Sequence, residues 1–349
     1  MSTQPRMEEA RLMETLASLD KEKQKEVLVD LAAEGNAAAA TELLRKLSQE
    51  NFREQLAYRN LIISTNKVAF WEGLLEFVVA GTWRGQPLEV VPSVSGCPRT
   101  LKPLLQSLFL AKRDGGADSA RDEALLNSLR SSNPDIRRVA AGTLGERKSR
   151  RAIDELARHL TDPHPRVRLH AARALKRIAD PTAVEPLIRC LSHEDEILSG
   201  EAADALGAIG PAAVPPLLQV LQSRDGWLRW LATRALSHIG DERAIDSLIT
   251  ALKDEDGGVR WLAAEALIKS GPKAVEPLLR ALLREKMTPW FQEGSHHVIG
   301  SISQKVNGRR AAILRPLLLS LEEIDAGVEA PVAAARALDE LRSLGLLAA

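Results

Sequence analysis

The sequence predicts an all-α fold, a right-handed α-α superhelix in which helix pairs stack along one axis. One leucine column recurs at Leu144, Leu175, Leu206, Leu236 and Leu267. A nearly constant step of about 31 residues is typical of an array of structural repeats, and we expect Val298 to continue the column. Aromatic residues make up only 3% of the chain and hydrophobic residues 45%, so Leu, Ala, Val and Ile must form the core, as in Ala- and Leu-rich helix pairs.

Each repeat is predicted to hold two helices separated by a polar turn. The first helix opens near a proline, as at Pro186 and Pro277, where proline loses no backbone hydrogen bond. The second helix carries paired alanines, which let neighbouring helices approach closely. Gly210, Gly240 and Gly271 follow it, at the position where a helix stops with positive φ.

The repeats are expected to fill residues 121–349 with about seven units. Residues 1–112 lack the period but keep a helical pattern, and we expect them to form a cap for the array or a separate binding module. Glycine and proline predict an irregular loop at 81–100 with room for one short strand, and the segment 113–120 is the expected linker.

The repeat units resemble a known family. EPLIRCLSHEDEILSGEAADALGAIGPAAV and DSLITALKDEDGGVRWLAAEALIKSGPKAV are similar to the short HEAT-like repeats first named for phycocyanobilin lyase subunits and also found in deoxyhypusine hydroxylase. The resemblance covers about residues 121–345 and implies a HEAT-repeat solenoid. A solenoid by itself implies no particular activity.

Charge and composition exclude several classes of protein. Lys+Arg and Asp+Glu both total 47, so no global basic field indicates nucleic acid or an anionic membrane. The N-terminus lacks the apolar segment of a secretory signal, and no run of 18 apolar residues is present. Cys97 and Cys190 form no CxxC pair, which favours a reducing compartment, and we expect a cytoplasmic protein.

An arginine column marks the start of each predicted second helix, at Arg137, Arg168, Arg229 and Arg260. We interpret it as a structural ladder, because repeated Arg and Asp can join neighbouring repeats by charge-assisted hydrogen bonds. The expected partners are the turn aspartates Asp162, Asp195, Asp225 and Asp256. A basic stripe that binds phosphate or an acidic peptide remains the alternative.

The candidate binding site lies one position after this column. Trp230 and Trp261 stand there in successive repeats, and the position four residues later holds Arg234, Glu265 and His296. Spacing of i,i+4 places both columns on one helix face, which we expect to line the concave groove. Trp227 and Trp290 lie nearby in the sequence, and clustered Trp beside Arg is typical of a binding hot spot. The alternative is that the rings fill gaps in Ala-rich packing.

Metal chemistry and pigment binding are weaker expectations. The resemblance to deoxyhypusine hydroxylase implies His-Glu pairs on the repeat helices as iron ligands, yet the one such pair, His193-Glu194, falls in a turn. The matching helical sites hold Leu169-His170 and Gly200-Glu201. A Trp-lined groove could accept a flat tetrapyrrole, but no residue set points to bilin chemistry. We expect no metal, no cofactor and no catalytic residue.

A basic zone near 147–177 raises the possibility of nucleic-acid binding, as in the HEAT-like arrays of some alkylpurine DNA glycosylases. Neutral net charge argues against strong phosphate-driven affinity. The sequence therefore favours a non-enzymatic scaffold or adaptor that binds a protein or peptide segment. An enzyme or enzyme subunit of the bilin lyase or metal-dependent hydroxylase type is the first alternative, and a nucleic-acid-binding HEAT protein is the second.

Overall fold

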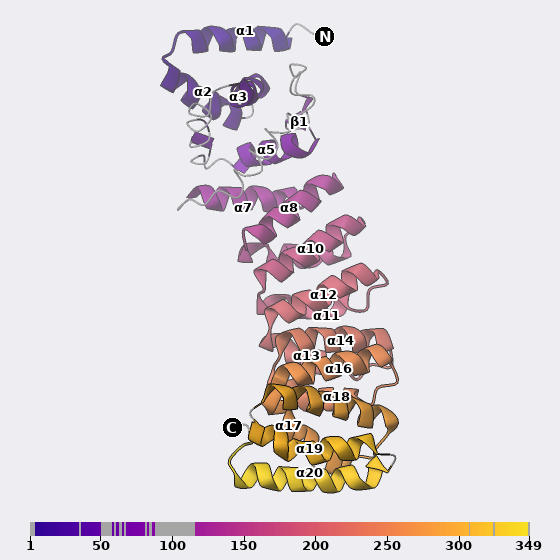
Figure 1. The fold of residues 1–349 in the computed structure, drawn as a ribbon. Helices are drawn as coiled ribbons and strands as arrows, with labels where there is room; N and C mark the ends of the chain where they lie inside the picture. Colours follow the sequence, from indigo (N-terminus) through magenta and orange to yellow (C-terminus); the bar gives the residue numbers. More distant parts are fainter. Residues whose placement is uncertain are drawn as a thin grey trace. The chain divides into compact units, whose positions relative to one another are not determined.

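The computed structural model describes residues 4–34, 36–49, 58, 61, 62, 65, 68–80, 82, 83, 86, 87, 116–306, 308–323 and 325–347 (Figure 1). The chain divides into two compact units, Met1–Ile178 and Ala179–Ala349. Helices dominate both units, and the predicted all-α repeat solenoid is confirmed. None of the described helices is long and apolar enough to cross a membrane.

The first part of unit 1 holds helices without the repeat period. They are α1 (Gln4–Ala17), α2 (Lys21–Ala33), α3 (Ala37–Gln49) and α5 (Val68–Ala80). Asp20 caps α2 by accepting a hydrogen bond from the backbone of Lys23, which fixes where this helix begins. Two short strands, β1 (Thr82–Trp83) and β2 (Gln86–Pro87), pair antiparallel in the segment expected to be a loop. The rest of that loop and the helix expected at 101–112 lie outside the described residues.

Seven helix pairs follow in the part of the chain described from residue 116 onward. Helix α7 begins inside the segment 113–120 that was expected to be a linker. Unit 1 contains the pairs α7 (Gly116–Ser128) with α8 (Pro134–Glu146), and α9 (Ile153–Arg158) with α10 (Pro165–Ile178). Unit 2 contains α11 (Val184–Cys190), α12 (Glu196–Ile209), α13 (Val214–Val220), α14 (Gly226–Ile239), α15 (Ile245–Ala251), α16 (Gly257–Ser270), α17 (Val275–Arg284), α18 (Pro289–Lys305), α19 (Gly308–Glu322) and α20 (Ala326–Ser343).

Short 3₁₀ turns surround the first helices of most pairs. Those that precede a first helix are η1 (Arg150–Ala152), η3 (Pro181–Ala183), η4 (Pro211–Ala213), η5 (Glu242–Ala244) and η6 (Gly271–Ala274), and η2 (His159–Thr161) follows α9. In four of the five preceding turns, proline or an N-cap aspartate stands at the start, which explains why the first helix opens where the sequence predicted.

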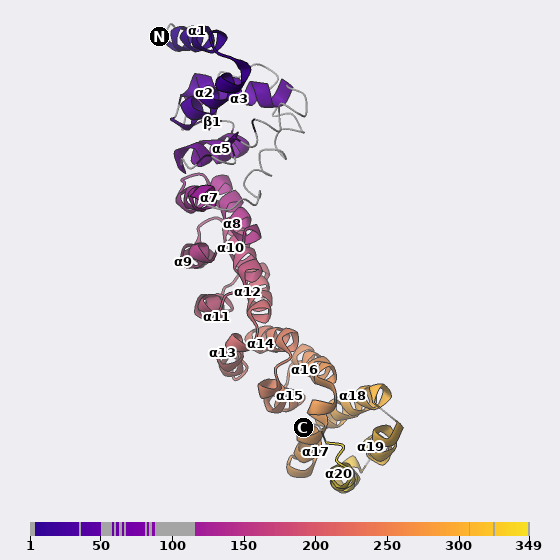
Figure 2. The ribbon, with the colours of Figure 1, turned by 90° about the vertical axis from the view of Figure 1, so that its left-hand side faces the viewer.

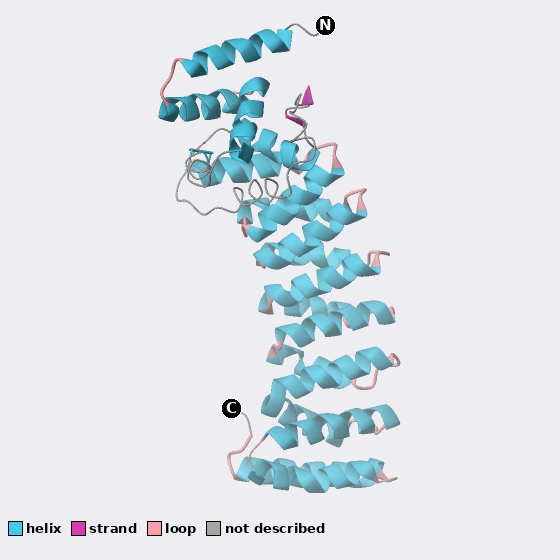
Figure 3. Ribbon diagram, turned by 45° about the horizontal axis from the view of Figure 1, so that its top comes forward, coloured by secondary structure: helices cyan, strands magenta, loops and turns pink. Residues whose placement is uncertain are grey.

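Unit 2 is built in two layers of helices, which Figure 2 shows side by side, and loops join its helices (Figure 3). The second helices α12, α14, α16 and α18 pack directly against one another, whereas the first helices α11 and α13 stand further apart. Tight spacing in one layer curves the stack toward that layer. Unit 2 therefore carries its second helices on the inner side.

Small side chains make the close packing of the second helices possible. Ala202, Ala203, Ala232 and Ala263 are completely buried between the layers, and so is Leu267 of the leucine column. Burial of each such leucine stabilises the fold by about 2 kcal/mol relative to an exposed one. The alanine pairs and the leucine column thus form the core that the sequence predicted.

A residue with positive φ follows every second helix from α8 to α16. Gly210, Gly240 and Gly271 stand at this position, as predicted, with φ of +87°, +67° and +62°. Lys148 and Ala179 occupy the same position in earlier repeats with φ of +52°. Sequence reasoning missed these two because it relied on glycine, although the same step along the chain leads from Lys148 to Ala179 and on to Gly210.

Glycine substitutions at two positions of unit 2 should have opposite effects on stability. Gly240→Ala places a β-carbon in the left-handed region and should lower the free energy of unfolding by about 1 kcal/mol. Gly200→Ala lies inside α12, where the new β-carbon meets only the tip of Arg234 at 3.7 Å, and should raise it by about 0.5 kcal/mol. Urea unfolding of both variants checks the prediction. Equal effects of the two would contradict it.

A candidate binding face on the second helices

The arginine column holds the turn that precedes its own helix. In each of Arg137, Arg168, Arg229 and Arg260, Nη1 donates to two backbone carbonyls five and six residues earlier, at distances of 2.8 to 3.4 Å. These carbonyls belong to the turn between the first and second helices, where no helical N–H reaches them. The column therefore satisfies the turn backbone in each of four repeats.

Arg137 and Arg229 of the column also bind a carboxylate of the next repeat. Arg137 makes a two-pronged ion pair with Asp162, at 2.8 and 2.9 Å, and Arg229 makes the same pair with Asp254, at 2.7 and 2.8 Å. Glu255 adds a contact of 3.1 Å to Arg229. Such paired, nearly buried contacts fix the geometry of adjacent repeats more strongly than exposed ion pairs do.

The ion pairs shift the pKa values of both aspartates downward. Burial acts to raise the pKa of the Asp254 carboxyl, but hydrogen bonds from Arg229 and the Asp256 backbone, with the charge of Arg229, outweigh it and hold the pKa below its ordinary value. Burial also opposes the shift at Asp162, whose pKa is nevertheless lowered by Arg137 and the backbone of His164. Hydrogen bonding to Asp254 raises the pKa of Arg229. Both pairs are therefore ionised at neutral pH.

The other turn aspartates act as helix caps. Asp195, Asp225 and Asp256 are N-caps, and their carboxylates accept hydrogen bonds from backbone N–H groups at the start of α12, α14 and α16. The residue that pairs with the arginine column stands two positions before the cap, as Asp254 does. Cap and ladder positions are too close in sequence to be told apart by spacing alone.

Trp227 and Trp230 stack on one another in the first turn of α14. Their ring centroids lie 4.9 Å apart and the planes differ by 8°. The indole N–H of Trp227 donates to the Ser199 hydroxyl at 3.3 Å, and the Arg234 guanidinium lies 5.5 Å from the Trp230 ring. The edge of Trp230 rests on Gly258 of α16. Neighbours on three helices thus hold this ring pair in place.

The remaining tryptophans of the predicted face are more open. Trp261 is 61% exposed and Trp290 is 49% exposed, compared with 38% for Trp227. The Arg260 guanidinium stacks 4.0 Å from the Trp290 ring centroid. Water solvates exposed aromatic rings of this size poorly.

Charged residues beside the rings form pairs between consecutive second helices. Arg234 bonds Asp204 at 2.7 Å. Glu265 lies 3.5 Å from His297, whereas His296 faces Glu322 at 3.1 Å. The column that holds Arg234 and Glu265 therefore continues to His297 in the next helix.

One extra residue before α18 explains the change of register from His296 to His297. The interval from the cap Asp256 to the cap Thr288 is one position longer than the interval between the two preceding caps. Buried Phe291 therefore takes the place of Val259, and Ile299 takes the place of Leu267. The expectation that Val298 continues the leucine column is wrong by one position.

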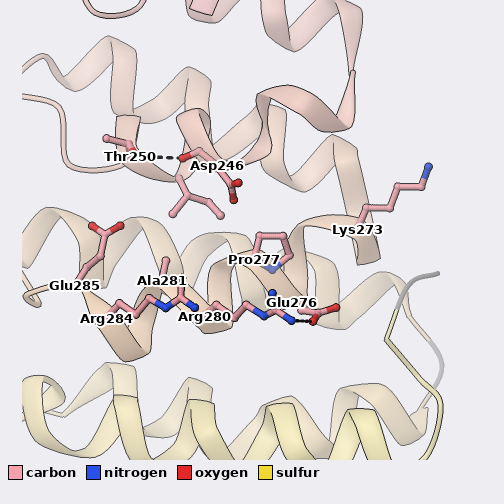
Figure 4. Close-up of a pocket in the computed structure, with 10 residues that line it drawn as sticks. Asp246, Thr250, Lys273, Glu276, Pro277, Arg280, Ala281, Arg284 and Glu285 are labelled. Carbon is pink, nitrogen blue, oxygen red and sulfur yellow. Dashed lines mark hydrogen bonds and ion pairs between the residues drawn. The ribbon is translucent and has the colours of Figure 1, made fainter.

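A second concave feature lies in the layer of first helices. It is a cleft of about 490 Å³ between α15 and α17 (Figure 4), and it is lined by Asp246, Ile249, Thr250, Lys273, Glu276, Pro277, Arg280, Ala281, Arg284 and Glu285. Many of its charges are already neutralised, since Glu276 pairs with Arg280 at 2.5 Å, Lys273 with Glu242 and Lys253 with Glu285. The lining carries both signs of charge in equal number, which favours no particular ligand.

In unit 1, several basic side chains of the zone 147–177 are already paired within the protein. Arg147 pairs with Asp122 at 2.6 Å and Arg151 with Glu123 at 3.2 Å, while Arg168 binds its own turn. Burial lowers the pKa of His170, and the nearby charges of Arg138, Arg173 and Arg177 lower it further. Among the described residues, no three His, Cys, Asp or Glu side chains come close enough to hold a metal ion.

These features define the class of protein: a helical-repeat solenoid that presents side chains from one layer of parallel helices. Comparison with known families places it more closely. The HEAT repeats family matches residues 123–207, 160–224, 184–268 and 214–299, which together cover just over half of the chain. The protein belongs to the HEAT-repeat family.

Curated relatives match only parts of this chain. A HEAT repeat-containing taxis protein of Halobacterium salinarum is 37% identical over 92 residues, which are 26% of this chain and 23% of that protein. The phycocyanobilin lyase subunit alpha of Synechococcus elongatus is 31% identical over 111 residues, 29% of this chain and 41% of that protein. The chain thus spans less than half the length of these relatives. The solved archaeal HEAT-like repeats protein of Thermococcus onnurineus is 15% identical, with a TM-score of 0.43 over 68% of this chain and 98% of that one.

The Arg229–Asp254 pair should make stability depend on pH. Asp254→Asn leaves the nearly buried guanidinium without its main charge partner and should lower the free energy of unfolding at pH 7 by about 2 kcal/mol. Because the folded-state pKa of Asp254 lies below 3.8, the pair's stabilisation is complete above that pH and is lost as the pH falls through the folded-state value. Urea unfolding at neutral and strongly acidic pH should therefore show the variant's deficit shrinking in acid. Asp339→Asn, at an exposed site, is the control, and a deficit that stays constant would exclude this account.

The contact between Trp230 and Gly258 can be tested by a double-mutant cycle. A β-carbon at Gly258 would stand 3.1 Å from the Trp230 ring, so Gly258→Ala should lower the free energy of unfolding by about 1 kcal/mol. In a Trp230→Ala background the same change should cost less, because the ring is absent and only the Asp256 carboxylate oxygen, at 3.1 Å, still crowds the β-carbon. Gly257→Ala, whose β-carbon meets only the end of Arg260, is the control. Additive effects of Gly258→Ala and Trp230→Ala would show that the two sites are not in contact.

Proposed function

We propose that this protein is a non-enzymatic scaffold that holds another protein through the inner face of its second helices. The observation that carries the proposal is the row of open tryptophan rings on α14, α16 and α18. The chain has six tryptophans, and four of them stand between residues 227 and 290. Such a concentration of tryptophans on one face is expected for a binding surface, and packing of the core does not require it.

The rigidity of the face supports the same function. The Trp227–Trp230 stack is held by Ser199, Arg234 and Gly258, and the helices beneath it are capped by Asp225 and Asp256. A surface that is ordered before binding loses little conformational entropy when a partner docks. Tryptophan is also among the residues that dominate binding energy in protein interfaces.

A bilin lyase subunit is the second candidate function. The similarity to the phycocyanobilin lyase subunit alpha favours it, although that match covers 29% of this chain. In this function the tryptophan rings would hold the flat pigment instead of a peptide. The absorption spectrum of the purified protein distinguishes the two, because a bilin absorbs visible light and a protein partner does not.

We further propose that the protein acts in the cytoplasm as an adaptor without bound metal. Cys190 is buried in the repeat core, as expected of a structural thiol. Metal analysis of the purified protein tests the absence of a metal, and fractionation of its own cells tests the location.

Removal of two exposed rings should abolish capture of the partner. Trp227→Ala combined with Trp261→Ala should reduce the stoichiometric protein partner recovered from the cell extract at least about tenfold, since hot-spot truncations cost about 2 kcal/mol or more. Mass spectrometry of affinity-purified complexes measures the loss. Leu319→Ala with Val328→Ala is the control, because both side chains are exposed on other helices. An unchanged set of partners would refute the binding face, and a bound pigment without a protein partner would favour the lyase subunit.

A further inference from the structure

Exposed apolar side chains recur at the same end of four consecutive second helices. Nine large hydrophobic residues are exposed among the described residues, and four of them are Ile197, Trp227, Trp261 and Trp290. Each stands within the first five residues of its helix, on α12, α14, α16 and α18. Because these helices pack side by side, the four side chains lie on neighbouring helices at one end of the same layer, and we call this set the apolar strip.

The spacing of the strip matches one kind of backbone. Packed helices lie about 8–10 Å apart. A polyproline II chain rises about 3.1 Å per residue with three residues per turn, so every third side chain points the same way at intervals of about 9 Å. Such a chain laid along the strip would place each third residue over the next helix. A β-strand repeats its side chains at about 6.6 Å and would drift out of register within two helices.

The charge around the strip indicates which side chains the partner carries. Exposed carboxylates flank the rings at Glu196, Asp225, Glu255, Asp256 and Glu293. Arg224 and Lys286 are exposed in the same turns, so the carboxylates are in excess. Arg229 is paired with Asp254, and the Arg260 guanidinium covers the Trp290 ring. Negative surroundings and exposed ring surface attract cations, and both are present at Trp227 and Trp261.

We infer that the apolar strip binds an extended, proline-rich segment of a protein that carries arginine or lysine at every third position. This inference rests on the proposed function and specifies its partner. Over α14 and α16, a cationic side chain lies against Trp227 or Trp261 and near the N-cap carboxylate of Asp225 or Asp256. The neutral prolines between them keep the segment in the conformation that matches the spacing of the helices.

Two labelled peptides of identical composition test the inference with the intact protein. Both have ten residues, four arginines and six prolines. In the first peptide arginine occupies every third position, and in the second the four arginines are clustered in the middle. Fluorescence anisotropy should show the spaced peptide binding about tenfold more tightly than the clustered one, since correct register adds two or three cation–π contacts. Equal affinities would overturn the inferred register.

Substitutions in the strip separate the contributions of the rings and the charges. Trp227→Ala with Trp261→Ala should weaken the spaced peptide about tenfold or more. Asp225→Asn with Asp256→Asn keeps both helix caps, because asparagine is an equally good N-cap, but removes two charges and should weaken binding about threefold at low salt. Leu319→Ala should leave the affinity unchanged. An affinity for the spaced peptide that does not respond to the tryptophan substitutions would overturn the inference.

The failure of this inference can be distinguished from failure of the proposed function. If neither peptide binds but the double tryptophan variant still loses a partner from cell extract, the face binds a protein of different chemistry and the inference is wrong. If a spaced peptide with glutamate in place of arginine binds best, the charge assignment is wrong. If the tryptophan variant loses neither peptide nor partner, the proposed function fails as well.

Discussion

The hydrogen bonds from the arginine column to the turn carbonyls organise four of the repeats, and the start of the second helix in each of them depends on these bonds. The turn between two helices of a repeat leaves backbone carbonyls without helical partners, and Nη1 of Arg229 satisfies two of them at 3.0 and 3.1 Å. With the turn held, the N-cap aspartate stands where it can start the second helix. Where the next turn offers an aspartate, as Asp254 does, the same guanidinium also joins consecutive repeats.

This arrangement separates the residues that hold the fold from those that contact solvent. Buried alanines and leucines and the arginine column form the inside of each repeat. In the first turn of each second helix, the solvent-exposed residues can differ from repeat to repeat. The packing of the stack does not depend on them. Ile197, Trp227, Trp261 and Trp290 are such residues, and side-by-side packing of their helices places them at one end of the same layer. Side chains that differ from repeat to repeat therefore lie next to one another on one surface of the array.

Much of the fold could be predicted because its signals repeat. The leucine column, the alanine pairs and the three glycines with positive φ were all evident in one sequence. Ala179 and Lys148 were missed, since neither residue type indicates positive φ. On the second helices, the predicted contact between Trp230 and Arg234 is present. The sequence pattern predicted His296 next to Glu265, whereas the structure places His297 there. A single extra residue before α18 shifts the register of that helix by one position, and the 31-residue period does not reveal this insertion.

The sequence by itself determined the class of fold, the period of the repeats and the helices that carry the tryptophans, because these depend on local patterns of side chains and turns. Only the tertiary structure decided which aspartate pairs with Arg229, that Trp227 and Trp230 stack, and that Trp261 and Trp290 stay open. These outcomes depend on contacts between consecutive repeats, such as those of Arg229 with Asp254 and of Trp230 with Gly258. Spacing along the chain names the helix on which a side chain stands, whereas packing between helices decides what that side chain touches.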